Sequence, residues 1–291
     1  MKSCPACRQP FQAADWCCPV CAHTPVMRDG FLSFAPALAA QNDGFDPELF
    51  RRYAQVEAGN FWFVARNQLL QREMRRHFPA PQSILEIGCG TGFVLSGIRA
   101  AYPDARLCGS DIFTEGLGFA AGRVPSASLF QMDATTIPFA DEFDLIGAFD
   151  VLEHIDDDCR ALTEIHRALQ PGGGVIFTVP QHPALWSRMD EYAHHKRRYT
   201  RADLLEKMRG AGFEVRYATS FVSLLLPAMW ASRLAQRNAP PAADGMDDGL
   251  KISPLLNRAF AGVMSVERAL LGAGLTFPAG GSLLVIGSKS R

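Results

Sequence analysis

The sequence predicts an α/β protein in which helices pack on both faces of a mostly parallel sheet. Three observations support this prediction. A short apolar segment at residues 83–87 is closed by three glycines at alternate positions, further apolar segments follow it, and segments with helical periodicity lie between them. Buried parallel strands have short apolar sequences, and a glycine turn into a helix brings backbone N–H groups close to a ligand.

The turn after the first predicted strand differs from a dinucleotide-binding turn. Gly88, Gly90 and Gly92 follow Glu86, whereas a pyrophosphate turn has its third glycine one residue later. A carboxylate beside the turn repels a phosphate and attracts a cation. The E-x-G-x-G-x-G pattern therefore indicates a cationic ligand, although an ordinary strand-to-helix connection stays open as an alternative.

The strands that follow each lead into an acidic or glycine-rich segment. Residues 106–110 predict a second strand that ends at Asp111, nineteen residues after Gly92, where a carboxylate can accept both hydroxyls of a ribose. Two further strands are predicted at residues 129–132, before Asp133 and Ala134, and at residues 143–149, before Asp150. The last three predicted strands are residues 175–179, 214–219 and 282–287. We expect the segment 170–174 to end a helix.

The order and spacing of these motifs over roughly residues 80–219 resemble those of class I S-adenosylmethionine (SAM) methyltransferases. The resemblance implies a Rossmann-like, seven-stranded sheet that binds SAM or its product S-adenosylhomocysteine. It assigns the methionine end to Glu86 and the glycines, the ribose to Asp111, and the adenine to Asp133 and Ala134. The full set of cofactor-binding residues it implies is Glu86, Gly88, Cys89, Gly90, Gly92, Asp111, Ile112, Asp133, Ala134 and Asp150. Either Asp111 or Asp133 would also suit a helix cap or a turn.

The first 21 residues hold five of the eight cysteines. Cys4 with Cys7, and Cys18 with Cys21, form two C-P-x-C pairs that suit a tetrahedral structural zinc site. Cys17 and His23 stay open as alternative ligands. Disulfides are the competing interpretation, and we expect reduced thiols because no secretory signal precedes the cysteines. The resulting ribbon either contacts a partner or packs on the catalytic domain.

Composition limits the partners that we expect. With 291 residues, 48% of them hydrophobic, the chain has room for one α/β domain and smaller additions. A net charge of −1 lacks the basic excess of proteins that bind mainly to phosphates, so nucleic acid is a weaker candidate than a small-molecule acceptor. No apolar segment is long enough for a transmembrane helix, and we expect a cytoplasmic protein.

We expect five segments along the chain. They are a zinc ribbon at 1–30, an N-terminal helical cap at 45–78, the SAM-binding core at 79–219, a helical insertion or lid at 220–278, and the final strand of the core at 279–291.

Two of these segments leave alternatives open. The cap contains consecutive aromatic residues at 61–63 that either line the active site or pack in a core. The insertion contains an apolar helix at 221–237, a segment at 238–249 that we expect to be disordered, and a second helix at 254–271. Its apolar face suits burial against the second helix, a lid over an acceptor, a homodimer contact or a membrane surface.

Two segments at the carboxyl ends of strands are candidates for catalysis. Glu153 and His154 resemble the E-H pair of ubiquinone-type O-methyltransferases. After the fifth strand come Asp190 and the segment 194–199, which contains two histidines and three cations. We predict His154 and His195 as bases and Arg198 as a substrate anchor. The alternatives are that the E-H pair supports the start of the next helix, and that the charged segment is solvated and precedes an N-cap at Thr200.

These inferences lead to a predicted enzyme that transfers a methyl group from SAM to an O, N or C nucleophile of a small, apolar or lipid-like acceptor. The long apolar insertion and the near-neutral charge favour this acceptor class. A ribosomal-RNA methyltransferase that uses the zinc ribbon for recognition is one alternative. A SAM-binding protein without catalytic activity is the other.

Overall fold

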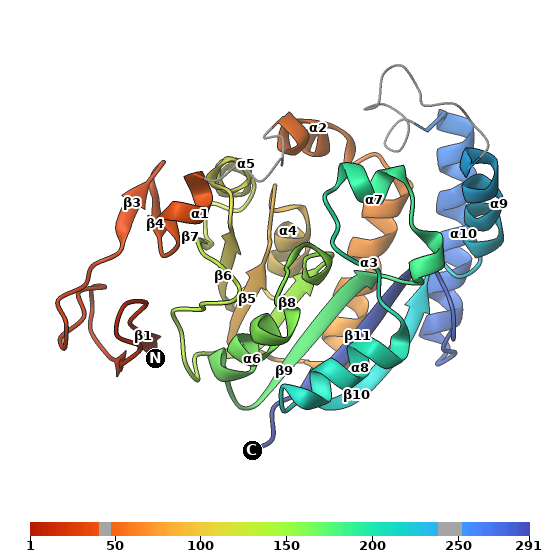
Figure 1. The fold of residues 1–291 in the computed structure, drawn as a ribbon. Coiled ribbons are helices and arrows are strands. Elements are labelled where there is room, and N and C mark those ends of the chain that lie inside the picture. Colours follow the sequence, from red (N-terminus) through yellow and green to blue (C-terminus); the bar gives the residue numbers. More distant parts are fainter. Residues whose placement is uncertain (41–47, 238–251) are drawn as a thin grey trace.

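The computed structural model describes residues 1–40, 48–237 and 252–291, and it confirms the predicted α/β architecture (Figure 1). Within these ranges one sheet has the strand order β10-β11-β9-β8-β5-β6-β7-β4-β3. Its strands are β3 (Val26–Arg28), β4 (Phe31–Ser33), β5 (Ser83–Ile87), β6 (Arg106–Asp111), β7 (Ser128–Gln131), β8 (Phe143–Phe149), β9 (Leu169–Pro180), β10 (Glu214–Phe221) and β11 (Ser282–Ser288). The strands from β4 to β9 run parallel, whereas β3, β10 and β11 pair antiparallel to their neighbours.

Helices cover both faces of the sheet, as expected when a parallel sheet is buried on both sides. Helices α3 (Phe61–His77), α4 (Phe93–Ala101) and α10 (Pro254–Gly272) cover one face, and α6 (Asp158–Ala168) and α8 (Arg201–Gly210) cover the other (Figure 1). The remaining helices are α1 (Pro36–Ala40), α2 (Glu48–Val56), α5 (Thr114–Arg123), η1 (Leu152–His154), η2 (Pro183–Leu185), α7 (Arg188–Tyr192) and α9 (Leu226–Arg237).

The alternating side chains of the strands divide the core into two layers. In β5, Leu85 and Ile87 pack in the layer beneath α6 and α8, whereas Ile84 packs in the layer beneath α3 and α4. The two-residue period of a strand therefore feeds both layers from one continuous apolar segment. Glu86 lies on the same face of β5 as Ile84, toward α3, and is buried.

The N-terminal segment extends the main sheet beyond the seven strands that we expected. A small sheet of β1 (Lys2–Ser3) and β2 (Pro10–Phe11) carries the cysteines, and the β3–β4 hairpin then continues the sheet, with Ser33 of β4 in parallel register with Gln131 of β7. The predicted segment boundary at residue 30 therefore falls inside this hairpin. Trp16 fastens the segment to the core, because its ring packs edge-on against Phe34 and Phe139. This arrangement covers an edge of β7 that would otherwise present unpaired backbone groups.

Two sequence-based boundaries were wrong. We expected a helix from residue 221, but β10 continues to Phe221, which pairs with Ser282 of β11, and the chain turns at Val222 with a φ of 58° before α9 begins at Leu226. Pairing with β11 thus overrides the local helical pattern. Residues 170–174 do not end a helix either, since α6 ends at Ala168 and these residues lie in β9. The predicted disorder at 238–249 and the predicted start of the cap at 45 lie outside the described residues.

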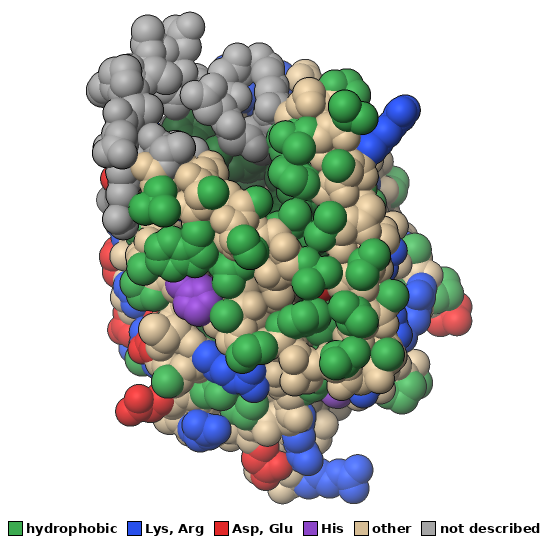
Figure 2. Space-filling model, turned by 90° about the vertical axis from the view of Figure 1, so that its right-hand side faces the viewer, with side chains coloured by type: hydrophobic (Ala, Val, Ile, Leu, Met, Phe, Trp, Pro, Cys, Tyr) green, Lys and Arg blue, Asp and Glu red, His purple; other side chains and the backbone are tan. Residues whose placement is uncertain are grey.

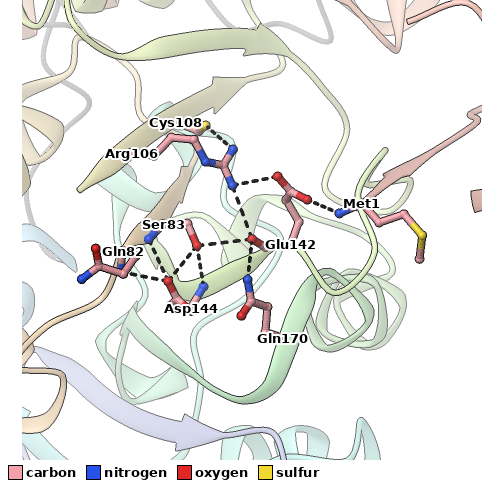
Figure 3. A network of polar contacts seen from close by, with 8 residues as sticks. All are labelled: Met1, Gln82, Ser83, Arg106, Cys108, Glu142, Asp144 and Gln170. Atoms are coloured by element: carbon pink, nitrogen blue, oxygen red, sulfur yellow. Dashed lines mark hydrogen bonds and ion pairs between the residues drawn. The ribbon is translucent and has the colours of Figure 1, made fainter. Parts of the chain in front are cut away.

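A polar network fixes the amino ends of the central strands (Figure 3). The Asp144 carboxylate of β8 accepts hydrogen bonds from the backbone N–H (2.8 Å) and the hydroxyl (2.9 Å) of Ser83 in β5. Arg106 of β6 donates to Glu142 (2.7 Å), whose carboxylate also pairs with the amino group of Met1. These contacts set the strand register at one edge of the sheet and leave the opposite, carboxyl edge to the candidate site.

No helix in the described part of the chain combines the length and the apolar character that a membrane crossing requires.

Candidate active site

The predicted cofactor residues gather at the carboxyl ends of β5, β6, β7 and β8. Ligands of open α/β sheets bind at this edge. Helices α2 and α7 lie above it in Figure 1. The segments that contribute are the glycine turn after β5, the Asp111 turn after β6, Asp133 after β7 and Asp150 after β8.

The glycine turn is possible only without side chains at two of its positions. Gly88 has a φ of +67°, and a Cβ atom there would lie 2.3 Å from the side chain of Val151, which follows β8. Gly92 has a φ of +76° and caps α4, where a Cβ would lie 2.8 Å from the backbone of Ala120. The turn therefore brings the start of α4 close to the ends of β6 and β8, as a backbone cradle for a ligand requires.

Asp111 joins the glycine turn to the end of β6. Its carboxylate accepts hydrogen bonds from the backbone N–H groups of Gly90 (2.9 Å) and Phe113 (3.0 Å). Burial raises the pKa of Asp111 to about 6, even though these two bonds favour the ionised form. Each carboxylate oxygen keeps a second lone pair, so Asp111 can still accept hydrogen bonds from a ligand.

The other two predicted contacts around this turn are Cys89, which is buried, and Ile112, which is partly buried. The N–H of Cys89 donates to the carbonyl of Ser110 (2.9 Å), and burial raises the pKa of the Cys89 thiol well above its ordinary value. The carbonyl of Ile112 accepts a hydrogen bond from the side chain of Gln131 (3.1 Å). Both residues therefore shape the turn through their backbone.

Asp133 forms a turn of its own at the end of β7. Its carboxylate accepts hydrogen bonds from the backbone N–H (2.8 Å) and the hydroxyl of Thr135. This is the turn role that the sequence left open, and the neighbouring Ala134 is buried. Adenine recognition by Asp133 and Ala134 stays a prediction.

Arg66 of α3 is a central residue of the site that the sequence analysis missed. It is buried, pairs with the carboxylate of Asp150, and lies over the ring of Trp62 at 4.4 Å. Burial raises the pKa values of Glu86 and Glu153 well above their usual range, and the charge of Arg66 offsets part of both shifts. The available signal was a charged residue within the buried stripe of the helix, next to Ala65 and one turn after Trp62.

Glu86 carries an unsatisfied acceptor into the site. Its side chain is buried, and its Oε2 atom has no hydrogen-bond partner in the described part of the chain. A buried carboxylate oxygen without a partner costs free energy, so it favours a ligand that supplies a proton donor or a positive charge.

The cap helix α2 lies over the glycine turn. The ring of Phe50 is 3.6 Å from the position that a Cβ of Gly90 would take. Glu57, which follows α2, is buried, accepts hydrogen bonds from the Thr91 hydroxyl (2.8 and 2.9 Å) and pairs with Arg123 (2.5 Å). These contacts tie the cap to the turn and close this side of the site to water.

The two predicted bases lie side by side. His154 ends η1 and His195 follows α7, and their rings are 4.8 Å apart and nearly perpendicular. Burial, together with the neighbouring His195 and His194, lowers the pKa of His154 to about 3. His154 is therefore a neutral imidazole at physiological pH. Glu153 adds a carboxylate to this pair, within 4.8 Å of a nitrogen of each ring.

The segment 194–199 is anchored, and its last residue, Tyr199, is buried, whereas His194 and Lys196 are exposed as the alternative interpretation held. The hydroxyl of Tyr199, which is fully buried, lies 2.6 Å from the carboxylate of Asp158 and 3.1 Å from the carbonyl of Leu152. The N–H of Lys196 donates to the carbonyl of Glu153 (2.7 Å). Thr200 caps α8, as predicted. The segment is thus held against η1.

The sequence placed Asp190 in the same candidate group as the segment 194–199 but gave it no role of its own. It lies 2.9 Å from Nδ1 of His195 and accepts a hydrogen bond from Nε of Arg198 (2.7 Å). Burial opposes ionisation, but the hydrogen bonds from His195 and Arg198 outweigh it and hold the pKa of Asp190 below its ordinary range. Arg198 also donates to the carbonyl of Gln181 (3.1 Å), so two of its nitrogens act within the protein, and its role as a substrate anchor stays a prediction. Ser187 and Asp190 form a capping box, and their spacing in the sequence is a local signal for the ordered position of Asp190.

The four predicted metal ligands form a compact group in the N-terminal segment. The sulfur of Cys4 lies 3.6 Å from that of Cys21, and the sulfur of Cys7 lies 3.7 Å from that of Cys18. All four sulfurs lie within 4.8 Å of one another. Cys17, the alternative ligand, is exposed and not part of this group.

Residues 51–218 match a protein family described as methyltransferase domain. A malonyl-[acyl-carrier protein] O-methyltransferase of Methylococcus capsulatus is 34% identical over 152 residues, which cover 47% of this chain and 54% of that protein. A demethylmenaquinone methyltransferase of Chlorobaculum parvum is 28% identical over 125 residues, which cover 43% and 51%. The chain thus spans about half the length of these curated relatives.

Solved structures share the fold at low sequence identity. A complex of the Haloferax volcanii Trm112 methyltransferase activator with a methyltransferase matches with a TM-score of 0.56 at 20% identity, over 83% of this chain and 98% of that chain. The geranyl diphosphate C-methyltransferase of Streptomyces coelicolor matches with a TM-score of 0.53 at 12% identity, over 76% and 75%. At these identities the likeness establishes the fold.

Replacing Arg66 tests whether its charge holds the acidic site together. We expect Arg66→Met to lower the free energy of unfolding by about 3 to 5 kcal/mol at pH 8, because it leaves buried carboxylates without their cation. The loss should be smaller at pH 5, because burial raises the pKa values of Glu86 and Glu153 and a lower pH therefore favours their neutral forms. Urea denaturation at both pH values measures it.

The matched control is Arg75→Met, since Arg75 is exposed on the same helix. We expect it to change stability by less than about 1 kcal/mol. Equal losses for the two variants, or a loss for Arg66→Met that does not depend on pH, would contradict the role given to Arg66.

Proposed function

The chain belongs to the family of methyltransferase domains, and on that basis we propose that it transfers a methyl group from SAM to an O, N or C nucleophile of a small, apolar or lipid-like acceptor. The observation that carries the proposal is the glycine turn flanked by the buried acids Glu86 and Asp111. A site with this charge suits a ligand with an ammonium and a sulfonium group and no phosphate.

The residues of the site fit SAM. We propose that Glu86 and the backbone of Gly88 and Gly90 hold its methionine end, because the unpartnered oxygen of Glu86 matches a cationic donor. Asp111 would accept the ribose hydroxyls through its remaining lone pairs, and Asp133 with Ala134 would contact the adenine. Bound SAM supplies an activated methyl carbon.

The protein then has to align the acceptor, exclude water and accept a proton. Helix α2 closes one side of the site through Phe50 and Glu57. Asp190 orients His195 by holding its Nδ1 atom, which leaves the Nε2 atom of a neutral ring as the proton acceptor. Burial lowers the pKa of His154 and makes it a weak base, and we propose that it shapes the acceptor site.

The helical insertion supports an apolar acceptor. Its face of the molecule carries many hydrophobic side chains (Figure 2). Helix α9 contacts η2 (Pro183–Leu185), the turn between β9 and α7, so the insertion lies on the side of the site that carries Asp190. The exposed apolar residues of the insertion and its flanks are Leu224, Trp230, Leu234, Leu255, Leu256, Val266 and Leu275. The same face would also suit a homodimer contact or peripheral contact with a membrane.

The names of the relatives also favour a small acceptor over RNA. One is named for malonyl-[acyl-carrier protein] and another for demethylmenaquinone. The ribosomal-RNA alternative depends on the four-cysteine segment, and that segment packs on the core through Trp16.

We further propose that Cys4, Cys7, Cys18 and Cys21 bind one structural zinc ion. Sulfur–sulfur separations of 3.6 and 3.7 Å suit a tetrahedral site, and four thiolates leave no open coordination position. The ion would hold together a segment that is too small to fold on a core of its own.

Transfer of labelled methyl groups tests the activity. The full chain is incubated with methyl-labelled SAM and cell extract, which is then separated into lipid, small-molecule, RNA and protein pools. We expect label in the lipid or small-molecule pool. Label in RNA would establish the ribosomal-RNA alternative, and binding of S-adenosylhomocysteine without any transfer would establish the non-catalytic one.

Two glycine variants serve as controls for this assay. Gly88→Ala should abolish transfer, because its Cβ would collide with Val151 at a positive φ. Gly118→Ala should leave transfer unchanged, because a Cβ at Gly118 meets open space.

Cofactor affinity should depend on the ionisation of Asp111. If the ribose hydroxyls need an ionised carboxylate and its pKa is about 6, affinity for S-adenosylhomocysteine falls by about ten-fold between pH 7 and pH 5. Calorimetry across this range measures the change. Asp111→Asn should bind S-adenosylhomocysteine more weakly and show no such pH dependence. A wild-type affinity that is constant from pH 5 to pH 7 would contradict the assignment of Asp111 to the ribose.

The adjacent cysteines 17 and 18 allow a matched test of the zinc site. We expect the wild type and Cys17→Ser to purify with about one zinc ion per chain, and Cys18→Ser to lose it, because only Cys18 lies in the sulfur group. Elemental analysis gives the zinc content and thermal melting gives the stability. Zinc loss in Cys17→Ser with retention in Cys18→Ser would show that Cys17, and not Cys18, is the fourth ligand.

A further inference from the structure

We propose that Glu153, His154 and His195 form a second metal site, which binds a divalent transition-metal ion beside the acceptor. Each residue offers one ligand atom, and the three atoms lie within 4.8 Å of one another. They come from two segments, η1 after β8 and the loop after α7, that meet at the carboxyl edge of the sheet. The site is separate from the four cysteines in sequence and in ligand chemistry.

The carboxylate of Glu153 provides the first argument. Its side chain is fully buried, and neither oxygen has a hydrogen-bond partner among the described residues. The neighbouring acids differ, because Asp158 pairs with Lys207 and Asp190 pairs with Arg198. Burying a carboxylate without a partner is costly unless it meets a cation. A metal ion held with the two imidazoles would supply that cation.

The support of His195 provides the second argument. A histidine that binds a metal usually donates its other ring N–H to a carboxylate, which fixes the orientation of the ring. Asp190 lies 2.9 Å from Nδ1 of His195, and the backbone N–H and hydroxyl of Ser187 both donate to Asp190 at 2.8 Å. This chain of contacts leaves Nε2 of His195 as a ligand.

The backbone around the three residues is held in place as well. The hydroxyl of Tyr199 lies 3.1 Å from the carbonyl of Leu152, and the N–H of Lys196 donates to the carbonyl of Glu153 at 2.7 Å. These two contacts fasten the segment that carries His195 to the one that carries Glu153 and His154. The arrangement is pre-organised, as a binding site requires.

The ligand set indicates the class of metal. Two imidazoles and one carboxylate suit Mn²⁺, Fe²⁺, Co²⁺, Ni²⁺ or Zn²⁺ better than Ca²⁺ or Mg²⁺, which prefer oxygen ligands alone. Three protein ligands leave coordination positions open for an oxygen of the acceptor. An acceptor hydroxyl bound there would have a lower pKa and would lose its proton to solvent before its oxygen attacks the methyl carbon, because His195 as a ligand no longer accepts the proton. This role rests on the proposed function, whereas metal binding itself does not.

Binding of Mn²⁺ tests the site. The full chain is first saturated with zinc at the four cysteines and freed of excess zinc, and Mn²⁺ is then titrated while free Mn²⁺ is followed by electron paramagnetic resonance. We expect the wild type to bind about one Mn²⁺ per chain. Glu153→Gln and His195→Asn should lose at least about ten-fold in affinity, and Asp190→Asn, a positioning residue, should lose roughly ten- to hundred-fold.

His194→Asn is the matched control, because His194 is exposed and lies outside the three-residue group. It should bind Mn²⁺ like the wild type. Absence of Mn²⁺ binding to the wild type, or equal affinity in the wild type and Glu153→Gln, would overturn the proposal.

Thermal melting separates a lost ligand from a lost fold. Mn²⁺ should raise the melting temperature of the wild type and of His194→Asn but not that of Glu153→Gln or His195→Asn, because only a native-state ligand stabilises the fold. Cofactor binding is measured on the same samples. Wild-type protein that binds S-adenosylhomocysteine but not Mn²⁺ overturns the metal site alone, and the reverse result overturns the proposed function alone.

Discussion

The ion pair between Arg66 and Asp150 is the contact on which the organisation of the site depends. Three acids, the buried Glu86 and Glu153 and the partly buried Asp150, lie within the influence of this one guanidinium. Arg66 comes from the cap, whereas the acids follow strands of the core, so the pair also fastens α3 to the edge of the sheet. Since one cation cannot compensate three carboxylates, the site keeps an excess of acid. That excess favours cationic ligands and disfavours phosphates, which agrees with a glycine turn that departs from the dinucleotide pattern.

The N-terminal segment supports the same site from the end of the sheet where β4 lies beside β7. Gln131 of β7 donates to the carbonyls of Ala35 (3.0 Å) and Ile112 (3.1 Å), and Asp29 accepts a hydrogen bond from the hydroxyl of Thr114 (2.6 Å) at the start of α5. The loop after Asp111 is therefore held by the segment that continues from the four cysteines. If a zinc ion orders those cysteines, the ion also stabilises the predicted ribose site, although the ion lies outside that site. A supporting role for the metal follows from these contacts without any further partner.

The sequence was most informative where local rules determine the structure. Gly88 and Gly92 identified the turn because positive φ angles and close contacts exclude side chains there, and the apolar segments gave the strands of the core. It failed where distant partners decide. The β3–β4 hairpin is recognised only through its pairing with β7, and residue 221 joins a strand only because β11 lies beside it. Arg66 was not predicted as a site residue because its partner Asp150 is far away in sequence, and Asp190 was named without a role because only the folded loop brings it to His195 and Arg198.

Burial shifts the pKa values of the acids and of His154 in opposite directions. It raises the pKa values of Glu86, Asp111 and Glu153 and lowers that of His154, so each of these groups is driven toward its neutral form. A cation that binds beside the carboxylates favours their ionised forms, and it must therefore displace their protons. Cation binding and proton release are thus linked in this pocket. The acidic half responds to the charge of its ligand, while the neutral imidazole of His154 keeps a lone pair for an acceptor proton or a metal ion.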